Sequence, residues 1–233
     1  MDIIGFWNTR GLNKPHKQKE INMFMNNQRV GLFGLLKTKI KRAKAQQAAL
    51  NICNGWSFTT NLIKHPAGRI WVVWKPGIYD VNITIVSEQL IHCIVQHRGT
   101  RRQFNVTIVY GFNNQSMRRR LWEDIKSIHQ MVNRPWAIMG DFNSILSTEE
   151  RVGSSVTMAK IREFKKCMEE CSLQDMRSSG AYYTWSNKQP GDSRVMSKID
   201  RVLINYEWTI KLPASEVHYM QLGLFYHAPG IIN

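Results

Sequence analysis

Residues 136–146 read WAIMGDFNSIL, an apolar run that stops at Gly140, Asp141, Phe142 and Asn143. The apolar part is typical of a buried strand, and in an extended chain residues two apart point to the same side. Asp141 and Asn143 would then face one way, while Phe142 would turn into the core. A carboxylate and an amide placed together can orient a water molecule or bind an oxyanion. The alternative is that Asp-Phe-Asn only begins a turn, and the tripeptide alone does not decide between the two.

Segments with the patterns of strands and helices lie on both sides of this run. Apolar and β-branched residues predict strands at 3–7, 31–36, 69–74, 83–86, 90–97, 103–110, 135–141 and 199–204, and weaker ones at 56–60, 182–185 and 214–220. A helical period predicts helices at 17–27, 117–132 and 158–171, with a more basic candidate at 41–52. Many strands with a few helices between them favour an α/β fold of two packed mixed sheets covered by helices.

The composition excludes a disordered chain and favours an anionic partner. Of 233 residues, 43% are hydrophobic, and 32 Lys plus Arg stand against 17 Asp plus Glu, which gives a formal net charge of +15. No repeat and no Gly/Ser-rich or Pro-rich linker divides the chain, so we expect one domain over residues 1–233. Basic residues gather at 37–44, 98–102, 118–120 and 165–166. Each group alone is compatible with a solvated surface, but together they favour binding to a nucleic-acid backbone.

The cysteines and the lengths of the apolar runs indicate the cellular compartment in which the protein is expected. Cys53, Cys93, Cys167 and Cys171 have no paired C-x-x-C spacing, which favours core thiols in a reducing compartment over a disulfide framework. No run approaches the ~18 apolar residues of a membrane span. The opening MDIIGFWNTRG does not have the pattern of a signal peptide. We therefore expect a nuclear or cytoplasmic protein that is not secreted and has no membrane partner.

Further polar residues follow predicted strands, where a rigid strand would fix the backbone and expose the side chain. Asn8 follows residues 3–7 in GFWNTRGL, Tyr110 closes QFNVTIVYG, Asp200 lies in KIDRVLIN, and His227 lies in LGLFYHAPG. A histidine with an aspartate partner forms a tuned proton carrier. Taken alone, His227 would more often be a surface or capping histidine, and only a partner such as Asp200 together with the Pro229 context would favour a catalytic role.

Seven short motifs follow one another along the chain, and their order indicates a resemblance to a known family that no single motif would indicate. WNTRGL, LLKTK, VYGFN, GDFN, YYTWSN, KIDRVL and FYHAPG follow one another between residues 3 and 231. In this order the chain resembles the endonuclease/exonuclease/phosphatase superfamily, and more narrowly the apurinic-type endonuclease domain of plant LINE-like (non-LTR) retrotransposons. The resemblance implies a four-layer α/β sandwich with its site at one edge and a closing strand near residue 230 that could be truncated. In complete elements of this kind a reverse transcriptase follows the domain.

The resemblance also implies roles for individual residues. Asn8 matches an asparagine that organises the metal and phosphate region, and Tyr110 matches a tyrosine whose hydroxyl contacts the scissile phosphate. Asp141 matches an aspartate that aligns or deprotonates the attacking water, and Asn143 an asparagine that steadies the charge on phosphorus. The implied cofactor is Mg²⁺ or Mn²⁺, for which Asn8 and Asp141 would be weak ligands. No small-molecule cofactor is implied.

The remaining implied roles concern a proton carrier and the contacts to DNA. Asp200 matches a carboxylate that hydrogen-bonds the catalytic histidine, and His227 matches that histidine. Which of the aspartate and the histidine is the general base stays open. Trp185 in YYTWSN is equally compatible with stacking near a base and with core burial. The residues expected to contact nucleic acid are Arg10, Lys37, Arg118, Arg119 and Trp185.

Two positions depart from the family pattern. Lys37 in LLKTK stands where the family has a metal-binding glutamate, and Tyr226 in FYHAPG stands where it has an aspartate. At ~4 Å and an effective dielectric of ~20, a unit charge and a dication interact by about 8 kcal/mol. An ammonium group therefore repels the ion that a carboxylate would attract, and Mg²⁺ prefers anionic oxygens. We expect the metal side of the site to be lost at Lys37 and Tyr226.

Three functions remain open on the sequence alone. The first is a Mg²⁺-dependent DNA endonuclease domain of a retrotransposon-derived protein, impaired by Lys37 and Tyr226. The second is a catalytically inactive, basic DNA-binding remnant. The third is a phosphatase or phospholipase of the same superfamily, which the basic charge and the WNTRGL and TWSN motifs disfavour. We expect a monomer that binds DNA.

Overall fold

The structure is a computed structural model that describes residues 3–66, 68–223 and 225–233. Within these residues, one of two large sheets has seven strands, in the order β11 (Ser178–Gly180), β15 (Val217–Tyr219), β16 (Gly230–Ile232), β1 (Ile3–Asn8), β2 (Val30–Leu36), β4 (Ile70–Trp74) and β3 (Ser57–Thr60). Strand β1 runs parallel to β2, and β11 runs parallel to β15. The other neighbours in this sheet are antiparallel.

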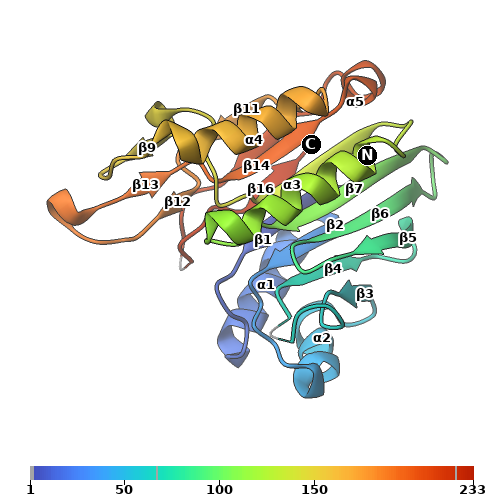
Figure 1. Cartoon of the computed structure of the whole chain (residues 1–233). Coiled ribbons are helices and arrows are strands. Elements are labelled where there is room, and N and C mark those ends of the chain that lie inside the picture. The colour runs from blue at the N-terminus through green and yellow to red at the C-terminus, as the bar shows by residue number, and fades with distance from the viewer. Residues whose placement is uncertain (1–2, 67, 224) are drawn as a thin grey trace.

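The second large sheet has six strands in the described part of the chain, in the order β10 (Gln174–Asp175), β14 (Asp200–Ile204), β8 (Trp136–Asp141), β7 (Gln103–Tyr110), β6 (Leu90–His97) and β5 (Tyr79–Val86). Its strands β7 and β8 are parallel, and the other neighbours are antiparallel. A small sheet at one end of the molecule contains β12 (Trp185–Ser186), β13 (Met196–Ser197) and β9 (Arg151–Val152) (Figure 1).

Helices cover the outer face of each large sheet. In Figure 1, α1 (Pro15–Asn27) and α2 (Ala45–Cys53) lie on the side of the seven-stranded sheet, and α3 (Gln115–His129) and α4 (Met158–Glu170) lie on the side of the six-stranded sheet. The short helix α5 (Tyr206–Lys211) and the 3-10 turns η1 (Arg42–Lys44), η2 (Thr148–Glu150) and η3 (Gly191–Ser193) complete the helical elements that the structure describes. The predicted four-layer α/β sandwich is confirmed. No described helix has the length and apolarity of a membrane-spanning segment.

Apolar clusters join the four layers. Phe6 and Ile108 belong to the cluster between the two sheets. Ile52 belongs to the cluster under α1 and α2, and Leu121 and Phe164 belong to the cluster under α3 and α4. Both faces of each large sheet are therefore covered, which explains why β2 reads VGLFGLL without polar alternation and is buried along its whole length.

The longer predicted elements agree with the structure to within a few residues, and the short ones do not. The basic candidate helix at 41–52 begins as the 3-10 turn η1 and becomes α-helical at Ala45. The strand predicted at 182–185 is reduced to β12, and the one predicted at 214–220 is reduced to β15. Helix α5 and the other strands of two or three residues outside the closing strand were not predicted, because such short segments show no usable periodicity. The closing strand is β16, which pairs with both β1 and β15. The four cysteines are buried and free, as expected of core thiols.

The two sheets approach closely where Gly34 of β2 meets Ile108 of β7. A Cβ atom on Gly34 would lie 2.7 Å from Ile108 Cγ2 and 2.9 Å from its Cδ1. We expect Gly34→Ala to lower the free energy of unfolding by about 1–3 kcal/mol, because overpacking a dense core displaces its neighbours. Urea denaturation measures this loss. Gly77→Ala is the matched control, because a Cβ atom there would meet nothing within 4 Å.

A double variant tests whether the contact itself causes the loss. Ile108→Ala removes the atoms that crowd Gly34, so Gly34→Ala combined with Ile108→Ala should lose less stability than the two single changes added together. Additive losses would show that Gly34 and Ile108 do not oppose each other across the two sheets.

Candidate active site

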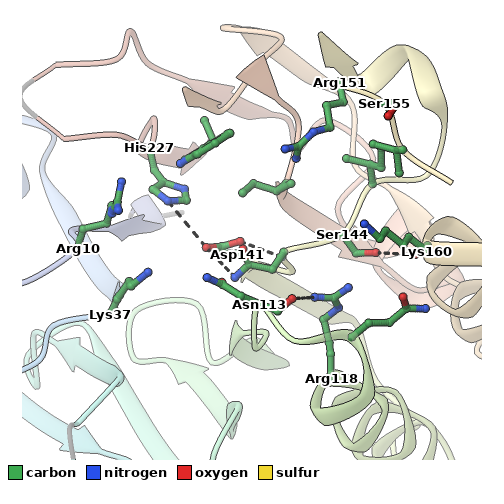
Figure 2. A pocket seen from close by; sticks show the side chains of 16 residues that line it. Arg10, Lys37, Asn113, Arg118, Asp141, Ser144, Arg151, Ser155, Lys160 and His227 are labelled. Atoms are coloured by element: carbon green, nitrogen blue, oxygen red, sulfur yellow. Dashed lines mark hydrogen bonds and ion pairs between the residues drawn. The ribbon is translucent and has the colours of Figure 1, made fainter. Parts of the chain in front are cut away.

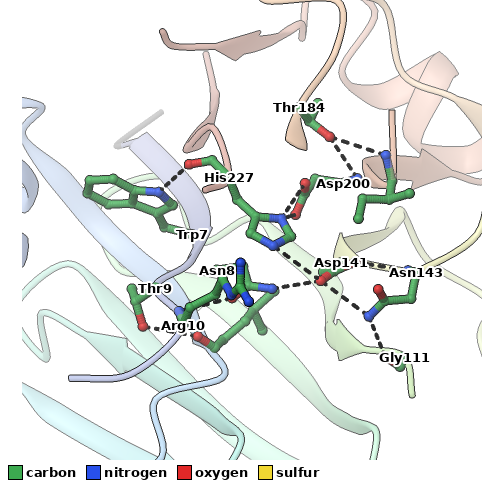
Figure 3. Close-up of polar contacts among 12 residues, drawn as sticks. Trp7, Asn8, Thr9, Arg10, Gly111, Asp141, Asn143, Thr184, Asp200 and His227 are labelled. Carbon is green, nitrogen blue, oxygen red and sulfur yellow. Dashed lines mark hydrogen bonds and ion pairs between the residues drawn. The ribbon is translucent and has the colours of Figure 1, made fainter. Parts of the chain in front are cut away.

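The candidate site lies where strands of both large sheets end side by side. Asp141 ends β8 and is in register with Tyr110 of β7 and with Asp200 of β14. From the other sheet, Asn8 at the end of β1 donates its Nδ2 to Asp141 Oδ2 at 2.6 Å (Figure 3). Residues far apart in the sequence thus meet at one edge of the sandwich, with the Asp141 carboxyl group in the middle.

The segment after β8 turns sharply around the Asp141 carboxyl group. Gly140 has a φ of +141°, and a Cβ atom there would lie 2.1 Å from the Val109 carbonyl oxygen, so only glycine fits. Asn143 has a φ of +48°, and its backbone N–H donates to Asp141 Oδ1 at 2.9 Å. The Asn143 Nδ2 also lies 3.3 Å from Asp141 Oδ2, while the Phe142 ring is fully buried. Phe142 turns into the core as predicted, but Asp141 and Asn143 meet through a turn, so the extended geometry predicted for these two residues is wrong.

His227 is held between the two aspartates. Its Nδ1 lies 2.9 Å from Asp200 Oδ2, and its Nε2 lies 3.9 Å from Asp141 Oδ2. The His227 carbonyl oxygen accepts from Trp7 Nε1 at 2.8 Å, and the Thr184 hydroxyl oxygen accepts from the Asp200 backbone N–H at 3.0 Å. The backbone on both sides of the His227–Asp200 pair is therefore fixed (Figure 3).

Burial controls the protonation of these three groups. Burial raises the pKa of Asp141 to about 6, and the neighbouring Asp200 carboxyl group adds to the rise. Burial also raises the pKa of Asp200 well above its usual value and lowers the pKa of His227 to about 4. Near neutral pH the His227 imidazole is therefore neutral, and one proton lies between its Nδ1 and the Asp200 carboxyl group. The Nε2 side faces Asp141, where a proton can be accepted or returned.

The site opens into a cavity of about 440 Å³ (Figure 2). Asp141 is the single carboxylate among the described residues that line it, and none of the lining lysines and arginines forms an ion pair with a carboxylate that the structure describes. The apolar part of the wall includes Ile145, Val156 and Trp185. The cavity is therefore an anion-attracting space, with cations contributed by Arg10, Lys37, Arg118, Arg151 and Lys160.

The two positions that depart from the family pattern lie on the same side of the site. Lys37 lines the cavity; burial lowers the pKa of its ammonium group, while Asp141 acts in the opposite direction. Arg10 lies with its guanidinium carbon 4.1 Å from the centre of the Tyr226 ring. Both cations, Lys37 and Arg10, also lower the pKa of His227, so their positive field extends to the imidazole.

Ligand atoms for a metal ion are present but are poorly suited to magnesium. Asp141, Asp200 and His227 bring one ligand atom each within 4.8 Å of one another, and this group could hold a metal ion. However, Asp200 is fully buried with both oxygens near His227 Nδ1, which leaves Asp141 as the accessible carboxylate. Mg²⁺ prefers several anionic oxygens, and here Lys37 and Arg10 stand beside the one that is available. The residues present therefore do not fit a magnesium site.

Other residues expected in the site lie in different surroundings. Tyr110 is buried beneath the Arg69 guanidinium, 5.4 Å from its ring centre, and burial raises the pKa of its hydroxyl. Arg118 lines the cavity but is only 5% exposed, because its Nη1 donates to the Phe112 carbonyl oxygen at 2.6 Å. Arg119 is directed away from the cavity and forms an ion pair with Glu163 on α4. Arg119 is thus not brought to the site with the other predicted residues.

Sequence reasoning missed several side chains that complete the site. Arg151 and Lys160 line the cavity, and Arg151 lies 5.8 Å from the centre of the Trp185 ring. Trp185 is half-buried, packs against the Ile199 cluster and lines the cavity, while its predicted stacking near a base stays a prediction. Thr184 stood in the quoted motif YYTWSN, but nothing in the motif indicated its contact with the Asp200 backbone. Such contacts depend on the packing of the small sheet.

The burial of Asp141 makes stability depend on pH in a testable way. Since the folded-state pKa of about 6 lies above the usual 3.8, ionisation destabilises the folded chain, and this cost grows as pH rises towards and through 6. The variant Asp141→Asn has no such titration. Relative to the unmodified protein, its free energy of unfolding should rise by roughly 2–3 kcal/mol between about pH 4 and about pH 7, at about 1.36 kcal/mol per pKa unit. Urea titrations in EDTA measure the difference, and a pH-independent difference would contradict the assignment.

Comparison of the sequence with protein-family models and with curated proteins finds no match. Among solved structures, the endonuclease domain of TRAS1, a telomere-specific non-LTR retrotransposon, is similar, with a TM-score of 0.77, 11% identity, and 100% of this chain and 98% of that chain covered. The AP endonuclease LMAP from Leishmania major has a TM-score of 0.75 and 14% identity over 99% of this chain and 86% of its own. An endonuclease/exonuclease/phosphatase family protein from Bacteroides thetaiotaomicron has a TM-score of 0.66 and 12% identity over 99% and 93%. The chain therefore has the fold of the endonuclease/exonuclease/phosphatase proteins.

Proposed function

We propose that the chain is the endonuclease domain of a retrotransposon-derived protein, that it binds the DNA backbone in the cavity, and that Mg²⁺-dependent cleavage is impaired. The observation that carries this proposal is the cavity wall, where five lysines and arginines surround a single carboxylate, Asp141. Such a wall favours phosphate groups, which are anionic, over a divalent cation. The neighbours named as a retrotransposon endonuclease domain and an AP endonuclease support nucleic acid as the ligand.

The part of the site that handles the attacking water is complete. Asp141 Oδ2 and His227 Nε2 lie 3.9 Å apart, so a water molecule between them could give its proton to either group. The Asn143 Nδ2 donates to the Gly111 carbonyl oxygen at 2.7 Å and lies 3.3 Å from Asp141 Oδ2, so it would exchange one of these contacts to donate to the phosphate oxygens. These residues would orient a phosphodiester and move a proton without any further group.

The part of the site that would stabilise the phosphate charge differs from that of the resembling family, because it offers side-chain cations where that family holds a metal ion. We infer that Lys37 and Arg10 occupy the region in which the resembling family holds a metal ion, and that they contact the phosphate directly. A lysine provides a fixed positive charge but does not activate a bound water as a metal ion does. Binding is thereby retained while the rate of hydrolysis falls.

Two alternatives are weaker. A fully inactive DNA-binding remnant would differ from the proposed impaired endonuclease only in having no residual rate of DNA cleavage. The arrangement of Asp141, Asn143 and His227 supports some hydrolytic capacity. A phosphatase or phospholipase would act on a small headgroup, whereas the basic charge of +15 favours a polymer of phosphates. The four free, buried cysteines support a nuclear or cytoplasmic location, which we also propose.

Restoring the lost acids tests the proposal. The variant Lys37→Glu combined with Tyr226→Asp should gain Mg²⁺-dependent nicking of supercoiled plasmid, since it removes one repulsive charge and adds two attractive ones, and the change at Lys37 alone strengthens the binding of the ion by roughly two orders of magnitude. Nicking rates measured over a series of Mg²⁺ concentrations give the affinity. Adding Asp141→Asn to the restored variant should abolish the gain, which separates the engineered site from a contaminating nuclease.

A charge-neutral variant separates binding from cleavage. Lys37→Met should weaken DNA binding in EDTA without creating Mg²⁺-dependent nicking, because it removes the phosphate contact and adds no ligand. The proposal fails if the unmodified chain nicks plasmid as fast as the restored variant, or if it does not bind DNA at all.

A further inference from the structure

The positive charge of the chain is concentrated in its first third. Residues 3–79 contain 13 lysines and arginines and one carboxylate, Glu20, a net charge of +12, whereas residues 80–233 contain 19 and 15, a net charge of +4. Every ion pair between described residues involves positions from Asp80 onwards. No ion pair between described residues therefore involves a lysine or arginine of residues 3–79, although Glu20 and Asp141 attract Lys17 and Lys37 over a longer distance.

Four of these cations, of which Arg10 and Lys37 line the cavity, lie on two loops, and a fifth, Lys17, lies in the first turn of α1. One loop follows β1 and leads into α1, and the other follows β2. The loops are joined by a hydrogen bond from the Leu12 N–H to the Thr38 carbonyl oxygen at 2.8 Å and by one from Asn13 Nδ2 to the Lys39 carbonyl oxygen at 3.0 Å. We call the five residues the cationic strip: Arg10, Lys14, Lys17, Lys37 and Lys39.

Aromatic rings, and not carboxylates, hold members of the strip in place. The Arg10 guanidinium carbon lies 4.1 Å from the centre of the Tyr226 ring, and Lys17 Nζ lies 5.0 Å from the centre of the Phe225 ring. A cation on an aromatic face is attracted by the ring but keeps its full charge. The strip is therefore ordered without being neutralised.

Two features of the cationic strip are unfavourable for the folded chain without a ligand: the backbone conformation of its loops and the mutual repulsion of its side chains. Arg10, Lys37 and Lys39 have φ values of +47°, +52° and +56°, a left-handed conformation that is unfavourable for residues other than glycine. Burial lowers the pKa of Lys17, and the neighbouring charges of Lys14, Arg10 and Lys39 lower it further, so the strip members repel one another. An unneutralised cluster in a strained loop pair is stabilised when a polyanion binds.

We propose that the cationic strip binds consecutive phosphates of a nucleic-acid backbone as it leaves the cavity, and that it does so without a divalent metal ion. The proposal rests on the proposed function, since Arg10 and Lys37 belong to both the strip and the cavity wall. A single phosphate would engage only the cavity, whereas five cations on two adjoining loops and the first turn of α1 match a chain of phosphates. Divalent ions compete with such contacts as counterions and weaken the binding.

The test is a salt titration of binding to a duplex of mixed sequence, in EDTA. The strip variant carries Lys14→Gln, Lys17→Gln and Lys39→Gln. The control variant carries Arg120→Gln, Lys126→Gln and Lys166→Gln, which removes the same charge from cations that are paired with carboxylates on α3 and α4. Circular dichroism and thermal unfolding establish that both variants are folded.

The strip variant should bind the duplex roughly 10- to 100-fold more weakly at ~0.1 M salt, and the slope of log K against log salt should shrink by about 2–3, close to 0.9 for each lost phosphate contact. The control variant should change the slope by less than about one. A dinucleotide with one phosphodiester should bind the unmodified chain and both variants equally. Exchanging EDTA for Mg²⁺ should not strengthen the binding of the unmodified chain.

Failures of the two proposals are distinguishable. If the unmodified chain binds no duplex, the proposed function fails together with the strip. If the unmodified chain binds duplex but the strip variant and the control variant lose equal affinity, only the proposal about the cationic strip fails. The same holds if binding requires Mg²⁺. Equal binding to phosphatidylserine vesicles and to duplex at the same salt concentration would also overturn the strip as a nucleic-acid site.

Discussion

The hydrogen bond between Asn8 Nδ2 and Asp141 Oδ2 is the contact on which the site depends. It joins the end of β1 in one sheet to the end of β8 in the other, at the edge where the two sheets meet. The carboxyl group that accepts it also accepts from the Asn143 backbone and faces His227. Because Asp141 is fully buried, it needs these donors to remain ionised, and the donors need the carboxylate to hold their positions. The geometry of the water-handling residues therefore follows from one buried carboxylate.

The same buried carboxylate bears on the proposed replacement of a metal ion by side-chain cations. Asp141 and Lys37 attract each other, and Arg10 also lines the cavity. A fixed ammonium group and a bound divalent ion satisfy a carboxylate in similar ways, but they differ in what they do to a phosphate. The ion polarises the phosphate and lowers the pKa of a bound water, whereas the ammonium group only attracts the phosphate. Under the proposed function, the chain would bind phosphate but would lack the group that accelerates hydrolysis.

The sequence predicted those parts of the site that short, ordered motifs encode. Asn8, Asp141, Asn143, Asp200 and His227 each follow or lie in a recognisable strand, and the structure brings them together. Contacts that depend on packing between distant segments were not predictable, and the clearest cases are Thr184 beneath Asp200 and Arg151 beside Trp185. The sequence also gave no sign of where each arginine of the run 118–120 points: Arg118 is buried at the cavity, whereas Arg119 forms an ion pair with Glu163 on α4. The long strands were predictable from buried apolar runs, whereas strands of two residues carried no pattern.

A crystal of the unmodified chain with a short duplex, soaked in Mn²⁺ and measured at the manganese absorption edge, tests the central claim most directly. The account predicts a backbone phosphate in contact with Lys37 Nζ and the Arg10 guanidinium, and no anomalous peak beside Asp141. A manganese peak bound to the Asp141 carboxylate, with Lys37 displaced from the cavity, would contradict it.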